Sequence, residues 1–154
     1  MVPTSEHTPA LRIERMTVRA DRIVCEAELS PQAPRTTTPA LAARIRAAFP
    51  GIEGHACING EGDIFGAVID HTSLPHVLEH LVVHLQASAA AAERPGTDDA
   101  VFVGTTEFTD AARRRARIEV SFADDLVALS AFRQAAAFLN DAVWALEGES
   151  SEAL

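Results

Sequence analysis

The sequence predicts an α+β domain in which helices pack on one face of a mainly antiparallel sheet. Two pairs of strand-like segments alternate polar with apolar residues, and each pair is followed by amphipathic helical segments. The chain has 154 residues and 47% hydrophobic content, which suffices for one core but not for two. We therefore expect a single domain over residues 11–146, with a flexible leader at 1–10 and a disordered acidic tail at 147–154.

The first strand pair is predicted at residues 11–19 and 22–29. In the second of these strands every other residue is apolar, so one face should be buried, formed by Ile23, Cys25, Ala27 and Leu29. Cys25 is therefore expected to be a small core residue without a chemical role. A disulfide between Cys25 and Cys57 is not expected, because the chain is predicted to lie in a reducing compartment.

A helix and a glycine-rich segment follow the first strand pair. Pro39 suits the first turn of this helix, and Pro50 ends it. The segment 51–66 has no steady hydrophobic period, so it should be a loop that can carry functional groups. A short helix is expected around residues 64–69.

The last third of the chain repeats the order of strand pair and helix. Strands are predicted at 101–106 and 115–122, and a long helix at about 124–146. Apolar residues of this helix recur at spacings typical of one buried stripe, at Leu129, Phe132, Ala136, Leu139, Val143 and Leu146.

The most informative motif is the HxxEH run His76-Val77-Leu78-Glu79-His80, within a helix predicted over residues 73–91. Residues four apart share one helix face, so His76 and His80 can bind one metal ion together. Zinc binds neutral imidazole nitrogens and, in catalytic sites, keeps a position open for water. Glu79 can then take the proton of that water as it attacks a carbonyl. The motif therefore indicates a zinc-dependent hydrolase with Glu79 as its catalytic residue.

Two histidines leave a catalytic zinc site in need of a third protein ligand. His55 and Cys57 lie in the glycine-rich segment, which can fold over the helix, and zinc accepts either an imidazole or a thiolate. His55 is the preferred ligand and Cys57 the alternative. His84 lies about 12 Å along the helix from His76, too far to share one metal with both motif histidines. His84 is instead a candidate to hydrogen-bond to the imidazole of His80 without binding the metal itself.

The composition excludes some classes of partner. The net charge of -9 disfavours nucleic-acid binding, which needs clustered positive charge. Arginines occur at 113–115 and 117, where Arg115 and Arg117 should form the solvent face of a strand. No apolar stretch approaches the roughly 20 residues of a membrane span, and the N-terminus does not resemble a signal peptide. We therefore expect a cytoplasmic protein without a membrane partner; a homodimer would suit the exposed part of the last helix.

Several of these segments resemble the N-terminal domain of cyanophycin synthetase, an enzyme that polymerises aspartate and arginine. Phe49-Pro50-Gly51-Ile52 is similar to the family's LPGL, and His55-Ala56-Cys57 to its His-x-Cys pair. The run from His76 to Gln86 resembles the family's HVxEHVALELQ. The resemblance covers roughly residues 40–145. It implies a domain that acts as a metal-dependent hydrolase and clips the dipeptide-branched polymer to make new ends, or that holds the polymer.

The chain departs from this family in one segment and at one further position. The segment 102–108 replaces a basic FGKTR-like sequence with neutral and acidic residues, and His84 stands where the family has glutamate. We expect the ATP-grasp and Mur-ligase-like domains of the synthetase to be missing, and no GxxxxGK phosphate loop occurs in these 154 residues. We therefore do not expect the chain alone to be an ATP-dependent ligase. The charge and the lost basic segment favour a smaller or more cationic peptide than the polymer.

The predicted function is a zinc-dependent hydrolase of the HxxEH type that cleaves a peptide or isopeptide related to cyanophycin. Two alternatives remain open. One is a non-catalytic peptide-binding module, in which the helix edge recognises a peptide. The other is an accessory subunit of a separately encoded ATP-dependent peptide ligase, which would then be its protein partner.

Overall fold

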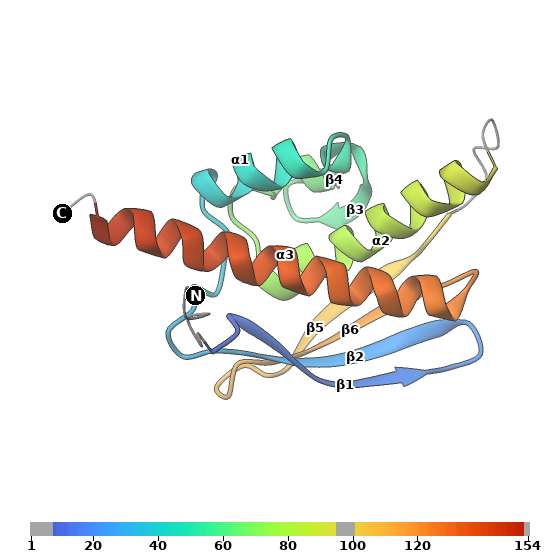
Figure 1. Ribbon diagram of the computed structural model, residues 1–154, viewed down its shortest axis with the longest axis horizontal. Helices are drawn as coiled ribbons and strands as arrows, with labels where there is room; N and C mark the ends of the chain where they lie inside the picture. Colours follow the sequence, from blue (N-terminus) through green and yellow to red (C-terminus); the bar gives the residue numbers. More distant parts are fainter. Residues whose placement is uncertain (1–7, 95–100, 153–154) are drawn as a thin grey trace, which may run out of the picture.

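The computed structural model describes residues 8–94 and 101–152, in which an antiparallel four-stranded sheet carries helices on one face (Figure 1). The strands are β1 (Leu11–Val18), β2 (Arg22–Leu29), β5 (Gly104–Asp110) and β6 (Arg115–Ser121), in the order β1-β2-β6-β5. The helices are α1 (Pro39–Ala48), α2 (Leu74–Glu93) and α3 (Asp125–Glu152). The predicted α+β class, with helices on one face of an antiparallel sheet, is confirmed.

The central strands β2 and β6 bury the face of the sheet that the sequence predicts. Cys25 lies opposite Ile118 in the antiparallel register, and both side chains are fully buried under α3 and α2. Burial raises the pKa of the Cys25 thiol to about 12, so this cysteine is an inert core residue, as expected. On the opposite face Arg115 pairs with Glu28 at 3.4 Å and Arg117 with Glu107 at 2.9 Å, which confirms their predicted exposure.

The motif helix α2 begins where its capping residues predict. Ser73 is the N-cap and its hydroxyl accepts a hydrogen bond from the His76 backbone N–H at 3.2 Å, with Pro75 in the first turn. The helix packs between α3 and the strands β5 and β6. Its inward positions are fully buried, at Leu74, Val77, Leu78, Leu81 and Val82. Among the described residues no helix is long and apolar enough to cross a membrane.

The segment between α1 and α2 holds more structure than the loop predicted there. A short 3-10 turn, η1 (Ile52–Gly54), leads into a small hairpin of β3 (Ala56–Asn59) and β4 (Gly62–Ile64). A second 3-10 turn, η2 (Phe65–Ala67), then stands in place of the short helix predicted around 64–69. The hairpin lies beside α2 in Figure 1 and brings the glycine-rich segment over the motif helix.

The bounds of one strand differ from the prediction. The sequence places a strand at 101–106, whereas β5 begins at Gly104 and ends at Asp110. Val101 and Val103, which suggested the strand, are 79% and 63% exposed. The bounds of β5 are set by its pairing with β6, from Gly104 opposite Val120 onward, and not by apolar residues of its own.

Both predicted terminal segments need correction where the structure describes them. Helix α3 continues to Glu152, so residues 147–152 are helical where a disordered tail was expected. Extending a helix that is already formed costs little, which explains this continuation. At the other end, Ala10 is fully buried, and the Trp144 indole donates a hydrogen bond to the carbonyl of exposed Thr8 at 3.0 Å. Residues 1–7 and 153–154 lie outside the described part.

Candidate metal centre

The two motif histidines converge at the N-terminal end of α2. His76 and His80 lie one turn apart, and their Nε2 atoms are 3.1 Å from each other. His80 is 3% exposed and stacks on Phe65 of η2, with ring centroids 4.1 Å apart. The ring of His76 meets the edge of the same phenylalanine. Phe65 therefore holds both imidazoles in place and shields them from water on one side.

Cys57 of β3 joins these histidines. Its Sγ lies 3.4 Å from His76 Nε2, and one donor atom each from Cys57, His76 and His80 all lie within 4.8 Å of one another. Tetrahedral zinc, with bonds of about 2.0–2.3 Å, separates its ligand atoms by about 3.3–3.8 Å. A thiolate and two imidazoles form a donor set that zinc binds well. Two of their separations, 3.1 and 3.4 Å, are close to this range, and the three residues fit a zinc ion in their chemistry.

A hydrogen bond orients His76 toward this cluster. The Thr72 hydroxyl lies 2.8 Å from His76 Nδ1, so the other ring nitrogen is the one directed at Cys57 and His80. Thr72 is itself anchored, because its backbone N–H donates to the Thr37 hydroxyl at 2.9 Å. Thr72 was not assigned to the site from the sequence. Its position four residues before His76, at the start of a helix, was the available signal.

Glu79 is buried beside the cluster. It is 6% exposed, and its Oε2 lies 3.5 Å from His80 Nε2. Its Oε1 accepts a hydrogen bond from the Thr106 hydroxyl of β5 at 2.8 Å. Burial raises the pKa of Glu79, and the bond from Thr106 partly opposes that shift. A carboxylate with a raised pKa, held in one orientation, is suited to accept a proton from water.

Space for Glu79 comes from a glycine on β5. A Cβ added to Gly104 would lie 2.5 Å from Glu79 Cγ and 2.9 Å from Cδ. Only a residue without a side chain allows β5 to approach the carboxylate this closely. Neither Gly104 nor Thr106 was assigned to the site from sequence, because nothing near Glu79 in the chain indicates which strand will cover it.

The other two candidate histidines form a separate pair. His55 Nε2 lies 3.2 Å from His84 Nδ1, and the rings are stacked with centroids 5.2 Å apart. The ring of His55 is also 5.7 Å from that of His80. The preferred third ligand of the sequence analysis thus lies next to the cluster but directs Nε2 at His84. His84, expected as a partner of His80, contacts His55 instead.

Burial keeps the four histidines neutral at physiological pH. Desolvation lowers the pKa of His80 to about 3 and that of His55 to about 4. Burial also lowers the pKa of His76 and of His84. Because a metal ion binds only the neutral imidazole, protons compete weakly for this site at neutral pH.

We expect the zinc-free protein to lose stability as the pH falls from about 7 to about 5. An unfolded histidine takes up a proton near pH 6.5, whereas folded His80 and His55 remain neutral down to pKa values of about 3 and about 4. The unfolded state therefore binds more protons in this window, so the free energy of unfolding falls with pH, by up to about 1.4 kcal/mol per pH unit for each group. Glu79 has the opposite effect. Because its pKa is raised in the folded state, the folded protein binds more protons at this residue than the unfolded protein above about pH 4.5, so its contribution to the free energy of unfolding rises as the pH falls.

The measurement is urea unfolding with a chelator present, at pH 7, 6 and 5. Because several buried histidines act against the single carboxylate of Glu79, we expect a net loss on the order of 1 kcal/mol per pH unit. His55→Gln should flatten the profile, because it removes one of the titrating groups. A profile independent of pH in both proteins would contradict the burial of neutral histidines.

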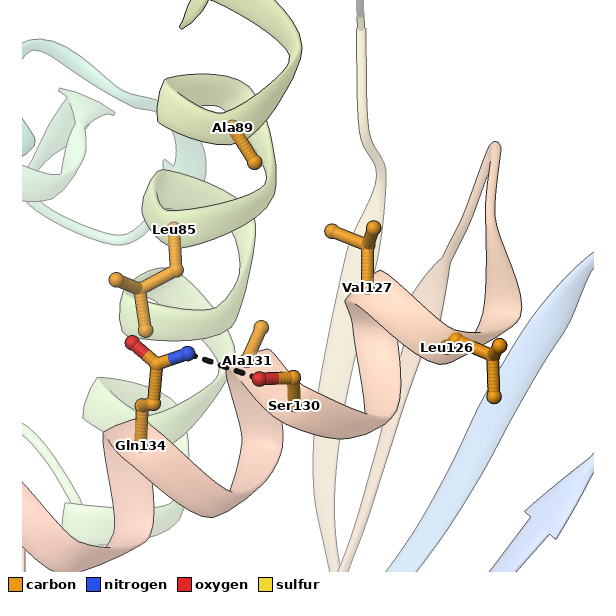
Figure 2. Close-up of a pocket in the computed structure, with 7 residues that line it drawn as sticks. All are labelled: Leu85, Ala89, Leu126, Val127, Ser130, Ala131 and Gln134. Carbon is orange, nitrogen blue, oxygen red and sulfur yellow. Dashed lines mark hydrogen bonds between the residues drawn. The ribbon is translucent and has the colours of Figure 1, made fainter. Parts of the chain in front are cut away.

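A groove of about 410 Å³ lies further along α2, outside this site (Figure 2). It runs between α2 and α3, and its lining residues are Leu85, Ala89, Leu126, Val127, Ser130, Ala131 and Gln134. Its polar groups bond to each other, since the Gln134 amide donates to the Ser130 hydroxyl at 2.9 Å. None of the histidines or Glu79 lines it, so the groove is separate from the candidate chemistry.

Comparison with known proteins supports the resemblance seen in the sequence. The family described as the cyanophycin synthase-like N-terminal domain matches residues 22–128. This match runs from β2 to the first turn of α3 and includes every residue of the cluster, Glu79 and both strands of the hairpin. No curated protein and no solved structure matches the chain.

Proposed function

Because the chain belongs to the family of cyanophycin synthase-like N-terminal domains, we propose that it is a metal-dependent hydrolase of the HxxEH type. Its substrate in this proposal is a peptide or isopeptide related to cyanophycin. One observation carries the proposal: the donor atoms of Cys57, His76 and His80 converge, and the carboxylate of buried Glu79 lies 3.5 Å from His80 Nε2.

In the proposed site Cys57, His76 and His80 hold one zinc ion. When bound, zinc lowers the pKa of a water molecule and polarises a carbonyl group. Thr72 keeps His76 in the orientation needed for binding. Three protein ligands leave the open position that distinguishes a catalytic zinc site from a structural one.

Glu79 handles the proton in this proposal. It accepts a proton from the attacking water as the water oxygen bonds to the carbonyl carbon, and it passes the proton to the departing amine as the C–N bond breaks. The products are a carboxylic acid and an amine, so atoms and charge balance without a further reactant. The Thr106 hydroxyl holds the other carboxylate oxygen and fixes the direction in which Glu79 acts.

The test is the zinc content of purified protein, measured by elemental mass spectrometry, alongside cleavage of a cyanophycin-derived dipeptide-branched oligomer and of a random peptide library. We expect about one zinc per chain, lost in the His76→Ala/His80→Ala double variant. Cys57→Ser should also lower zinc affinity, because it replaces one of the three proposed ligands, whereas His55→Gln should retain zinc.

The His55→Gln variant is the matched control for Cys57→Ser, because His55 directly precedes the hairpin strand β3 and lies two positions before Cys57. Retention of zinc by Cys57→Ser with loss in His55→Gln would assign the third ligand to His55. A protein that takes up no zinc even on incubation with it would overturn the hydrolase proposal and favour the non-catalytic peptide-binding module.

A further inference from the structure

Strand β5 forms one edge of the sheet, next to the candidate catalytic residue. Within the described ranges it pairs with β6 on one side and with no strand on the other. The opposite edge, β1, carries charged Arg12, Glu14 and Arg15 and an irregular register between residues 13 and 15, features that discourage pairing with another strand. The first half of β5 carries neither a charge nor a break in register before Glu107.

The direction of the free backbone groups follows from the register. The Val103 carbonyl accepts a hydrogen bond from the Ser121 N–H at 2.9 Å, so the backbone of Val103 faces β6. Thr105 and Glu107 lie two and four residues further along the antiparallel ladder, so their backbone groups face β6 as well. Because alternate residues face opposite sides, the N–H and C=O groups of Gly104 and Thr106 face the open edge. The N–H of Phe108 faces it too.

The same two residues contact Glu79. Gly104 leaves space for the carboxylate, and the Thr106 hydroxyl donates to it. A further strand would lie about 4.8 Å beyond β5. Its main chain would then run past the carboxylate that the proposed function uses as its base. Exposed apolar side chains flank this stretch, at Val103 and Phe108.

From these positions we propose that the open edge of β5 binds the substrate as an added antiparallel or parallel strand. This inference rests on the proposed function and names its substrate class: an extended polypeptide main chain, long enough to bond to both Gly104 and Thr106. Main-chain hydrogen bonds supply the affinity, so recognition tolerates many side chains. A free dipeptide, which spans too little of β5, is a poor substrate.

The first experiment follows backbone amides by NMR in the zinc-loaded Glu79→Gln full chain, which binds peptide without cleaving it. The probe is a library of acetylated, amidated decapeptides of random sequence. We expect shift changes and slower hydrogen exchange at Gly104, Thr106 and Phe108. The amides of Val103, Thr105 and Glu107, which already face β6, are the internal controls.

Phe108 offers a matched pair of variants. Phe108→Pro removes the outward N–H and keeps the ladder to β6, because proline is tolerated at outward positions of edge strands. Phe108→Ala removes the ring and keeps the N–H. We expect Phe108→Pro to weaken peptide binding about fivefold more than Phe108→Ala, the effect of one hydrogen bond. Circular dichroism confirms that both variants are folded.

Other results would overturn the inference. Equal peptide binding by the two Phe108 variants would show that the open edge of β5 does not bind the substrate. The absence of any change at the outward amides up to millimolar peptide would show the same. Protection of those amides without peptide, in a protein that sediments as a dimer, would show that β5 pairs with a second copy of the chain instead. Glu79-dependent cleavage without changes in β5 would contradict substrate binding at β5 and support the hydrolase proposal. If the protein binds no zinc but β5 still changes when peptide is added, peptide binding at β5 is supported and the hydrolase proposal is contradicted.

Discussion

Replacing Glu79 with glutamine should lower the rate of peptide hydrolysis by about 10²- to 10⁴-fold, the range usual for loss of a general base. Zinc content should stay unchanged, because Cys57, His76 and His80 supply the converging donor atoms. The amide oxygen can still accept the hydrogen bond from Thr106, so the side chain should keep its position. The measurement is the kcat of the variant, with its zinc content determined on the same sample.

This substitution has a second readout that does not depend on activity. Burial raises the pKa of Glu79, which means that the folded protein is destabilised by the ionised carboxylate. A neutral amide removes this cost, so the free energy of unfolding of Glu79→Gln at pH 8 should equal or exceed that of the wild type. Urea unfolding of the zinc-free proteins measures it.

Glu107→Gln is the matched control. Glu107 lies on β5 next to Thr106, but its side chain is 63% exposed and pairs with Arg117 on the outer face. Its loss should leave kcat within about twofold of the wild type, since exposed ion pairs contribute little. If Glu79→Gln retained full activity, or lost zinc together with activity, Glu79 would not be the base. In the second case it would be a ligand.

The parts of the fold that could be predicted are those whose signals are local. Alternation over residues 22–29 predicts β2 with its observed bounds, and Ser73 with Pro75 predicts the start of α2. The HxxEH spacing places His76 and His80 on one face through helix geometry alone. In each of these cases the residues that carry the signal lie close together in the sequence.

The unpredicted parts depend on contacts between distant residues. His55 and Cys57 are two positions apart, and only the path of the hairpin decides which side chain reaches the motif histidines. Thr106 is 27 residues from Glu79 in the chain. The bounds of β5 follow from its register with β6, because its own sequence contains few apolar residues. Spacing within a sequence does not carry this information.

Gly104→Ala should lower the rate of hydrolysis by about 100-fold while the protein stays folded and keeps its zinc. The added Cβ would lie 2.5 Å from Glu79 Cγ, inside any permitted contact, so the carboxylate has to move. A displacement of about 1 Å at a reacting group costs roughly this factor in rate. The hydrogen bond between Thr106 and Glu79 should weaken at the same time. The measurement is kcat with zinc content and circular dichroism on the same sample.

Gly54→Ala provides the control for this change. Gly54 lies in η1, and a Cβ there would meet nothing within 4 Å. Both substitutions remove the flexibility of a glycine from the unfolded chain, so they share that effect on stability. They differ in the clash with Glu79. If both variants hydrolysed peptide at the wild-type rate, the position of the carboxylate would not matter, and the close approach of β5 would be packing alone. Loss of activity in Gly104→Ala only would show that β5 positions the base.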